Sequence, residues 1–243
     1  MQPYKGWQFS WLILSKIVEK RMYKLRQILS SGLLSLVAAI AITNPVRANE
    51  VELVREVFSD YKSAILANNG QVVASNLSQS SIDYYRDMQK LAICAQASEV
   101  KAKSFVNRMQ VLVLRLRVPT EFLTQMSGQE VVVYAVERGW VGKESVTKLQ
   151  LGEVTISEPI ALGEALSNGR SIGAQFRFIK ESDMWKLDLT PLLKISNTAM
   201  VLLAREMNVE ENELLFRLVE SVSDRQLTQE VWEPVAPNDL LCQ

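Results

Sequence analysis

The stretch Leu149–Leu189, LQLGEVTISEPIALGEALSNGRSIGAQFRFIKESDMWKLDL, decides the fold class of this 243-residue chain. In its second half, apolar residues recur at every second position, which is the period of a β-strand with one buried face. Asn168-Gly169 is a strong hairpin signal, and Glu181-Ser182-Asp183 marks another turn. The pattern predicts an antiparallel meander with strands over residues 149–156, 160–166, 172–178 and 184–189.

Helical patterns flank this meander on both sides, so the expected fold class is α+β. A parallel α/β fold, with a ligand site where its strand order reverses, is not expected. Before the meander, apolar residues recur with helical spacing. We expect helices over residues 49–68, 71–77, 81–95 and 99–109, and a helical turn over 121–126.

The segment Gln110–Val118 changes period. Leu112, Leu114 and Leu116 lie on one face of an extended chain, and Arg115 and Arg117 lie on the other. Pro119 follows and ends the pattern. We therefore predict a strand here, with two arginines on its polar face.

The segment Glu130–Arg138 is ambiguous, because its run of valines has the composition of a strand. However, Ser127 and Glu130 have the spacing of a helix capping box, and Gly139 stands where a helix commonly ends. We favour a helix.

After the meander, Thr190-Pro191 combines an N-cap residue with proline at the first helical position. This predicts one helix to about Met207 and a second to Val222. Residues 49–190 are therefore expected to form the main domain, and residues 191–243 a helical extension docked onto the sheet.

The N-terminal segment resembles a secretory signal. Lys24 and Arg26 precede an apolar stretch of 15 residues, 28–42, and Val46 and Ala48 suit cleavage after Ala48. At a rise of about 1.5 Å per residue this stretch covers about 22 Å, less than the roughly 30 Å of a bilayer core. An uncleaved anchor is the alternative. Residues 1–21 fit a signal poorly, which suggests that translation starts at Met22. We expect an exported protein, periplasmic or extracellular, with no membrane span after processing.

Charge and composition exclude several classes of protein. The chain has 27 basic and 27 acidic residues, and residues 1–48 hold seven of the basic and one of the acidic residues. The remaining 195 residues carry 20 basic and 26 acidic side chains, a net charge of −6. An acidic domain without a basic run is a poor candidate for binding nucleic acid.

The chain contains no histidine, which excludes Ser-His-Asp and Cys-His catalysis and the HExxH zinc site. Its two cysteines, Cys94 and Cys242, form no CxxC motif, so no metal site is expected, and no cofactor motif is present. In an exported protein they could form a disulfide; the alternative is two unpaired thiols.

Several segments together resemble the exported NTF2-like (SnoaL-like) superfamily. These are the helix that ends at Asn68-Asn69-Gly70, the step from Leu77-Ser78-Gln79-Ser80 into Tyr84-Tyr85, and the closing strand Met184-Trp185-Lys186-Leu187-Asp188-Leu189. Val113–Arg117 and Gly139–Lys143 are also similar to an exported subgroup. The resemblance covers residues 50–190. It implies a cone, in which a bent sheet and helices enclose an apolar cavity, with sheet faces often used for dimerisation.

Five residues are candidates for ligand binding. Arg115 and Arg117 share a strand face in this interpretation and could clamp an anion, unless that face meets solvent. Tyr84 and Tyr85 would line a cavity or pack in the core, and Trp140 could stand at a pocket mouth or anchor the packing.

The favoured function is therefore a non-catalytic module that binds a small apolar or anionic ligand, or a protein partner, with a homodimer left open. One alternative is a histidine-free lyase or isomerase that uses Asp83 and Tyr84 or Tyr85, with a later carboxylate such as Asp188. Another is a purely structural interaction module in which Leu214, Leu215 and Leu218 fill the cavity. An Asp83 side chain that points outward would favour the binder.

Overall fold

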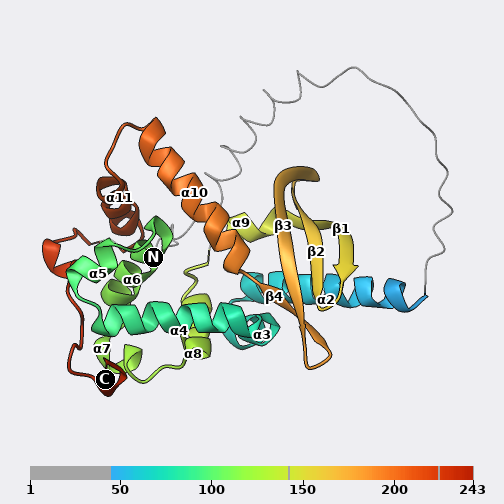
Figure 1. The fold of residues 1–243 in the computed structure, drawn as a ribbon, viewed down its shortest axis with the longest axis horizontal. Coiled ribbons are helices and arrows are strands. Elements are labelled where there is room, and N and C mark those ends of the chain that lie inside the picture. The colour runs from blue at the N-terminus through green and yellow to red at the C-terminus, as the bar shows by residue number, and fades with distance from the viewer. Residues whose placement is uncertain (1–44, 142, 224, 243) are drawn as a thin grey trace.

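The structure is a computed structural model that describes residues 45–141, 143–223 and 225–242 (Figure 1). The predicted signal segment and the start at Met22 fall among residues 1–44, outside the described residues. The expected cleavage point after Ala48 falls within the first described helix, which begins at Pro45.

The meander is confirmed. Four antiparallel strands pair in chain order, and positive φ angles at Asn168, Gly169, Ser182 and Asp183 turn the chain at both predicted turns. The strands are β1 (Leu149–Ser157), β2 (Ile160–Ser167), β3 (Arg170–Glu181) and β4 (Met184–Asp188). Ala161, Phe176, Phe178, Trp185 and Leu187 turn inward and are almost fully buried.

Several helices before the sheet begin where a side-chain oxygen caps them. Asn69, Ser78 and Ser127 each accept a hydrogen bond from a backbone N–H in the first turn of the helix that follows. The helix after Ser78 therefore begins at Gln79, two residues before its expected start at residue 81. Apart from α6, described below, the helices before the sheet are α2 (Pro45–Ala67), α3 (Gly70–Asn76), α4 (Gln79–Cys94), α5 (Ala97–Lys101), α7 (Thr120–Leu123), α8 (Gly128–Glu137) and α9 (Lys143–Thr147).

The preference for a helix over Glu130–Arg138 is confirmed by α8. Both halves of the capping box form: Ser127 Oγ accepts from the Glu130 N–H, and the Glu130 carboxylate accepts from the Ser127 N–H. These two bonds satisfy backbone donors at the helix start that valine side chains could not satisfy.

The predicted strand Gln110–Val118 is wrong. These residues belong to helix α6 (Phe105–Arg117), which Ser104 caps at its start. Ten of its 13 residues are buried, because α4, α5, α10 (Thr190–Glu206) and α11 (Glu211–Ser223) surround it. A helix buried on every side is apolar on every side, so a short segment of it also fits the alternating pattern of a strand.

The C-terminal helices share a core with the first half of the chain. Helix α10 (Thr190–Glu206) packs against both α6 and β3, and α11 (Glu211–Ser223) packs against α6. Two short 3₁₀ helices follow, η1 (Gln229–Trp232) and η2 (Leu240–Cys242). The extension therefore docks on the helical side as well as on the sheet.

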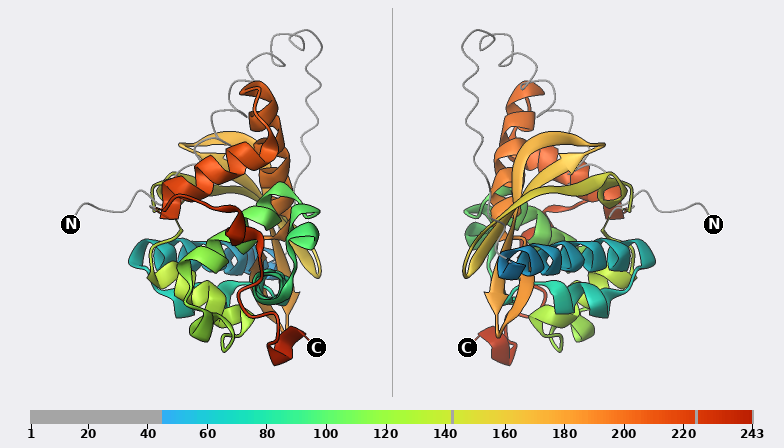
Figure 2. Two further views of the ribbon diagram at one scale, coloured as in Figure 1. Left: turned by 90° about the vertical axis from the view of Figure 1, so that its left-hand side faces the viewer. Right: turned by 90° about the vertical axis from the view of Figure 1, so that its right-hand side faces the viewer.

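Two hydrophobic cores result. The helical core centres on Leu112, Leu123 and Leu215, and the sheet core centres on Phe176, Phe178 and Leu187. Helix α2 runs along the sheet and contacts β1 and β4, while most other helices gather at the opposite end of the molecule (Figures 1 and 2). The α+β class is confirmed. The NTF2-like cone is not established, since its first expected strand is α6.

Candidate ligand-binding cavity

An apolar cavity of about 60 Å³ lies where the two cores meet. This is several times the space that one buried water requires. Its wall comes from five helices, from the loop after α8 and from the residue after β4. The lining residues are Tyr61, Ile65, Val73, Leu77, Tyr85, Gln110, Val113, Leu114, Val131, Val132, Ala135, Val136, Trp140, Val141 and Leu189.

Two glycines bring α8 close enough to form one side of this wall. A Cβ atom on Gly70 would lie 2.5 Å from the Val133 carbonyl oxygen, and one on Gly128 would lie 2.6 Å from the Ile82 carbonyl oxygen. Both are backbone atoms that cannot move aside without moving a helix. The absence of side chains at Gly70 and Gly128 therefore sets how closely α8 packs on α3 and α4.

Three polar side chains line the cavity among these apolar ones: Tyr61 on α2, Tyr85 on α4 and Gln110 on α6. Gln110 is 7% exposed. Within the part of the chain that the structure describes, neither tyrosine hydroxyl nor the Gln110 amide has a hydrogen-bond partner. Gln110 is buried and the two tyrosines are half-buried, so these three groups are available to pair with a molecule bound in the cavity.

The two phenols stay neutral. Burial raises the pKa of Tyr85 to about 12. Burial, and in second place the neighbouring Tyr85, raise the pKa of Tyr61 above its ordinary value of 10.0. Both hydroxyls therefore remain protonated at physiological pH and can donate a hydrogen bond as well as accept one.

Of the five residues singled out from the sequence, Tyr85 and Trp140 line the cavity and two others touch them. The Arg117 guanidinium lies over the Trp140 ring, 4.4 Å from its centroid. Tyr84 packs edge-on against Tyr85, and its hydroxyl donates to Asn107 Oδ1 at 3.1 Å, outside the cavity. Helix α6, rather than a strand, thus places Arg117 against Trp140.

Arg115 lies elsewhere and holds backbone carbonyl groups instead of an anion. Its five N–H groups donate to five carbonyl oxygens, those of Leu91, Ala92, Ala95, Val231 and Trp232. Every donor of the guanidinium is occupied, so Arg115 has none left for a ligand. It joins the end of α4 to η1.

Neither aspartate of the lyase or isomerase alternative lines the cavity. Asp83 is a half-exposed residue that pairs with Arg86 at 3.0 Å and accepts from Gln79 Nε2 at 2.9 Å. This is the outward orientation that favours a binder.

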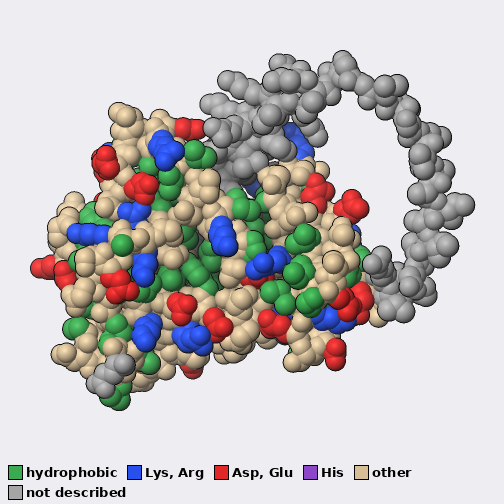
Figure 3. All heavy atoms as spheres, viewed as in Figure 1, with side chains coloured by type: hydrophobic (Ala, Val, Ile, Leu, Met, Phe, Trp, Pro, Cys, Tyr) green, Lys and Arg blue, Asp and Glu red, His purple; other side chains and the backbone are tan. Residues whose placement is uncertain are grey.

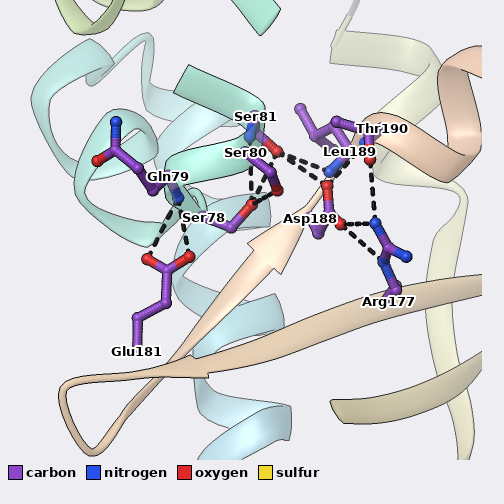
Figure 4. Close-up of polar contacts among 9 residues, drawn as sticks. All are labelled: Ser78, Gln79, Ser80, Ser81, Arg177, Glu181, Asp188, Leu189 and Thr190. Carbon is purple, nitrogen blue, oxygen red and sulfur yellow. Dashed lines mark hydrogen bonds and ion pairs between the residues drawn. The ribbon is translucent and has the colours of Figure 1, made fainter. Parts of the chain in front are cut away.

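Asp188 is fully buried in a polar network of its own (Figure 4). It accepts from Ser81 Oγ at 3.4 Å, from the Thr190 N–H at 2.9 Å and from Arg177 Nε at 2.6 Å. Burial opposes ionisation of this carboxyl, but the bonds from Thr190 and Arg177 outweigh it and lower its pKa. A carboxylate held ionised in this way is a structural anchor and not a general acid at neutral pH.

The C-terminal helix does not fill the cavity. Leu214 and Leu215 are buried in the helical core, and no residue of α11 lines the cavity. The structure therefore differs from the alternative in which the leucines of α11 fill the cavity and leave no ligand site.

Cys94 and Cys242 are joined by a disulfide, with their Cα atoms 5.4 Å apart. The bond fastens η2 to the end of α4, next to an open groove of about 590 Å³. Its sequence separation is 148 residues, so it closes most of the described chain into one loop.

The sequence analysis did not identify Tyr61 and Gln110 as candidates for ligand binding. Tyr61 stands on the apolar face of the first helix, where a tyrosine is usually part of the core. Gln110 was placed at the edge of a strand, but it is the one uncharged polar residue in the middle of the apolar run from Met109 to Leu114. A polar residue inside a fully buried helix was the available signal.

No protein-family model, curated protein or solved structure matches the chain. Among the described residues, no three acidic or cysteine side chains come together to hold a metal ion. A helix long and apolar enough to cross a membrane is not found in the described part of the chain. On the face shown in Figure 3, basic and acidic side chains are interspersed over helices and sheet.

Proposed function

We propose that this chain is an exported, non-catalytic binding domain that holds a small, mainly apolar ligand in the cavity between its two cores. One observation carries the proposal: an apolar cavity of about 60 Å³ lined by one buried amide and two half-buried tyrosines, none of which has a hydrogen-bond partner among the described residues. A cavity left only by imperfect packing would be lined by apolar groups alone.

Two further features support the proposal. The basic and apolar segments of residues 24–42, together with the disulfide, fit an exported protein. The NTF2-like resemblance implies an apolar cavity, and we retain the cone as a proposal for residues 49–190. Leu189, the last residue of the closing segment that carries that resemblance, contributes to the cavity wall.

The proposal is preferred over catalysis because the carboxylates needed for proton transfer, Asp83 and Asp188, have their partners outside the cavity. It is preferred over a purely structural module because α11 leaves the cavity open.

The test is native mass spectrometry of the full chain recovered from the exported fraction of its own host. We expect extra mass that is released on denaturation and that identifies the ligand. The matched variants are Ala135→Leu, which adds volume inside the cavity, and Ala67→Leu, which adds the same volume at an exposed position of α2. Ala135→Leu should lose the extra mass and Ala67→Leu should keep it. A wild-type protein without any adduct would overturn the proposal.

A further inference from the structure

We infer that the ligand is a neutral molecule of about five or six non-hydrogen atoms, with a branched apolar body and one hydroxyl or carbonyl oxygen. The inference rests on the proposed function and specifies the chemistry of the ligand.

The size follows from the volume of the cavity. About 60 Å³ corresponds to roughly four buried waters, at 10–15 Å³ of probe-occupied volume each. A branched C4 or C5 body with one oxygen is of that size. A long acyl chain or a multi-ring compound would require the helices around the cavity to separate.

The neutrality follows from the lining. None of the described residues that line the cavity is an aspartate, glutamate, lysine or arginine. Arg115 uses its donors on carbonyl oxygens, and the Arg117 guanidinium lies over the ring of Trp140. A carboxylate or an ammonium group in the cavity would lose its hydration without gaining an opposite charge, so charged ligands are disfavoured.

The single oxygen follows from where the polar groups lie. Tyr61, Tyr85 and Gln110 come from α2, α4 and α6, whereas α3 contributes only Val73 and α8 contributes four small apolar residues. The side chains from α2, α4 and α6 can therefore form hydrogen bonds, whereas those from α3 and α8 cannot. A ligand with an oxygen at one end and a hydrocarbon body at the other matches both parts.

Two pairs of isosteric probes test this inference. The first pair is 2-methyl-1-propanol and 2-methylbutane, which differ by a hydroxyl in place of a methyl group. The second pair is 3-methyl-2-butanone and 2-methylpropanoate, which differ by a methyl group in place of a charged oxygen. Binding of each probe to the full chain is measured by NMR titration, with the indole N–H of Trp140 as a reporter inside the cavity wall.

We expect the alcohol to bind at least fivefold more tightly than the hydrocarbon, and the ketone at least tenfold more tightly than the carboxylate. The first preference is diagnostic, because transfer from water to an apolar site alone favours the hydrocarbon. In the double variant Tyr61→Phe/Tyr85→Phe, which loses only two hydroxyls, the order of alcohol and hydrocarbon should reverse. Tyr84→Phe is the control, since its hydroxyl bonds Asn107 outside the cavity, and it should keep the wild-type order.

The outcomes separate the two proposals. If the hydrocarbon binds as well as the alcohol, and Ala135→Leu abolishes both, the binding function stands and the inferred ligand chemistry is wrong. If the carboxylate binds best, neutrality is wrong. If no probe binds and the three polar groups hold only water, both proposals fail.

Discussion

Arg115 on α6 donates from Nε to the carbonyl oxygen of Ala92 on α4, 2.9 Å away. The same guanidinium reaches Trp232, 117 residues further along the chain. Helix α4 ends at Cys94, and its last carbonyl groups have no partners within the helix. One buried cation therefore satisfies the end of α4 and fixes the C-terminal segment onto it.

Replacement of Arg115 by methionine should destabilise the protein by about 3–5 kcal/mol, because several charge-assisted hydrogen bonds of about 1.5–3 kcal/mol each are lost and the helix end relaxes only in part. Urea denaturation measures the effect. Arg86→Met, which removes an exposed pair with Asp83, should change stability by less than about 1 kcal/mol. Equal losses in the two variants would show that Arg115 has no special structural role.

Removal of the disulfide by Cys94→Ser/Cys242→Ser should cost about 3–5 kcal/mol, because a loop closed over 148 residues strongly restricts the unfolded chain. The wild-type protein should show the same loss when dithiothreitol is added, and the double variant should not respond to it. Denaturation curves that coincide with and without reductant in the wild type would contradict the assignment.

Replacement of Asp188 by asparagine should cost about 3 kcal/mol, since it leaves Arg177 and the Thr190 N–H without the charge that they bind. The exposed carboxylate of Asp60 offers the matched control, and Asp60→Asn should change stability by less than about 0.5 kcal/mol.

Asp188 also predicts a pH dependence. Its pKa is lowered in the folded state from the ordinary value of 3.8, so the unfolded chain binds the proton more readily. The stabilisation is complete above pH 3.8 and is lost as the pH falls through the lower, folded pKa. In acid denaturation, the stability difference between wild type and Asp188→Asn should therefore shrink below pH 3.8. A difference that grows in acid would contradict the ionised assignment.

Replacement of Gly70 by alanine should destabilise the protein by about 1–3 kcal/mol, because the new Cβ meets the Val133 backbone 2.5 Å away and α3 must shift from α8. Ligand binding should weaken together with stability, since both helices form the cavity wall. Ser75→Ala, at an exposed position of the same helix, should change neither quantity appreciably. Thermal unfolding and the alcohol titration measure the two effects.

The sheet could be predicted from the sequence because its turns are set by residues that are neighbours in the sequence. Asn168-Gly169 adopts positive φ at both residues, which is a local conformational preference. The same holds for α8, where Ser127 and Glu130 are three residues apart and cap the helix without help from the rest of the fold. The strand prediction over Gln110–Val118 failed for the opposite reason. The helix found there, α6, is buried by α4, α10 and α11, and no local sequence pattern indicates contacts with such distant helices.

Only part of the candidate site could be predicted, because a cavity depends on tertiary contacts that local sequence patterns do not indicate. Tyr85 and Trp140 were identified as large aromatic residues beside helix or loop signals, but their shared cavity was not. Arg115 and Arg117 were assigned to one strand face. In a helix, the side chains of residues two positions apart point in directions that differ by about 200°. Arg115 therefore reaches the end of α4, and Arg117 reaches Trp140.

The sequence by itself determined the α+β class, the order of the four strands, the two turns and the helix capped by Ser127, because turn conformations, capping bonds and side-chain alternation act over a few residues. The tertiary structure alone decided that α6 is a central helix, that Arg115 holds carbonyl groups, and that Tyr61, Tyr85 and Gln110 line one cavity. These three residues come from α2, α4 and α6, which are distant in sequence, and only the packing of the helices against one another brings such positions together.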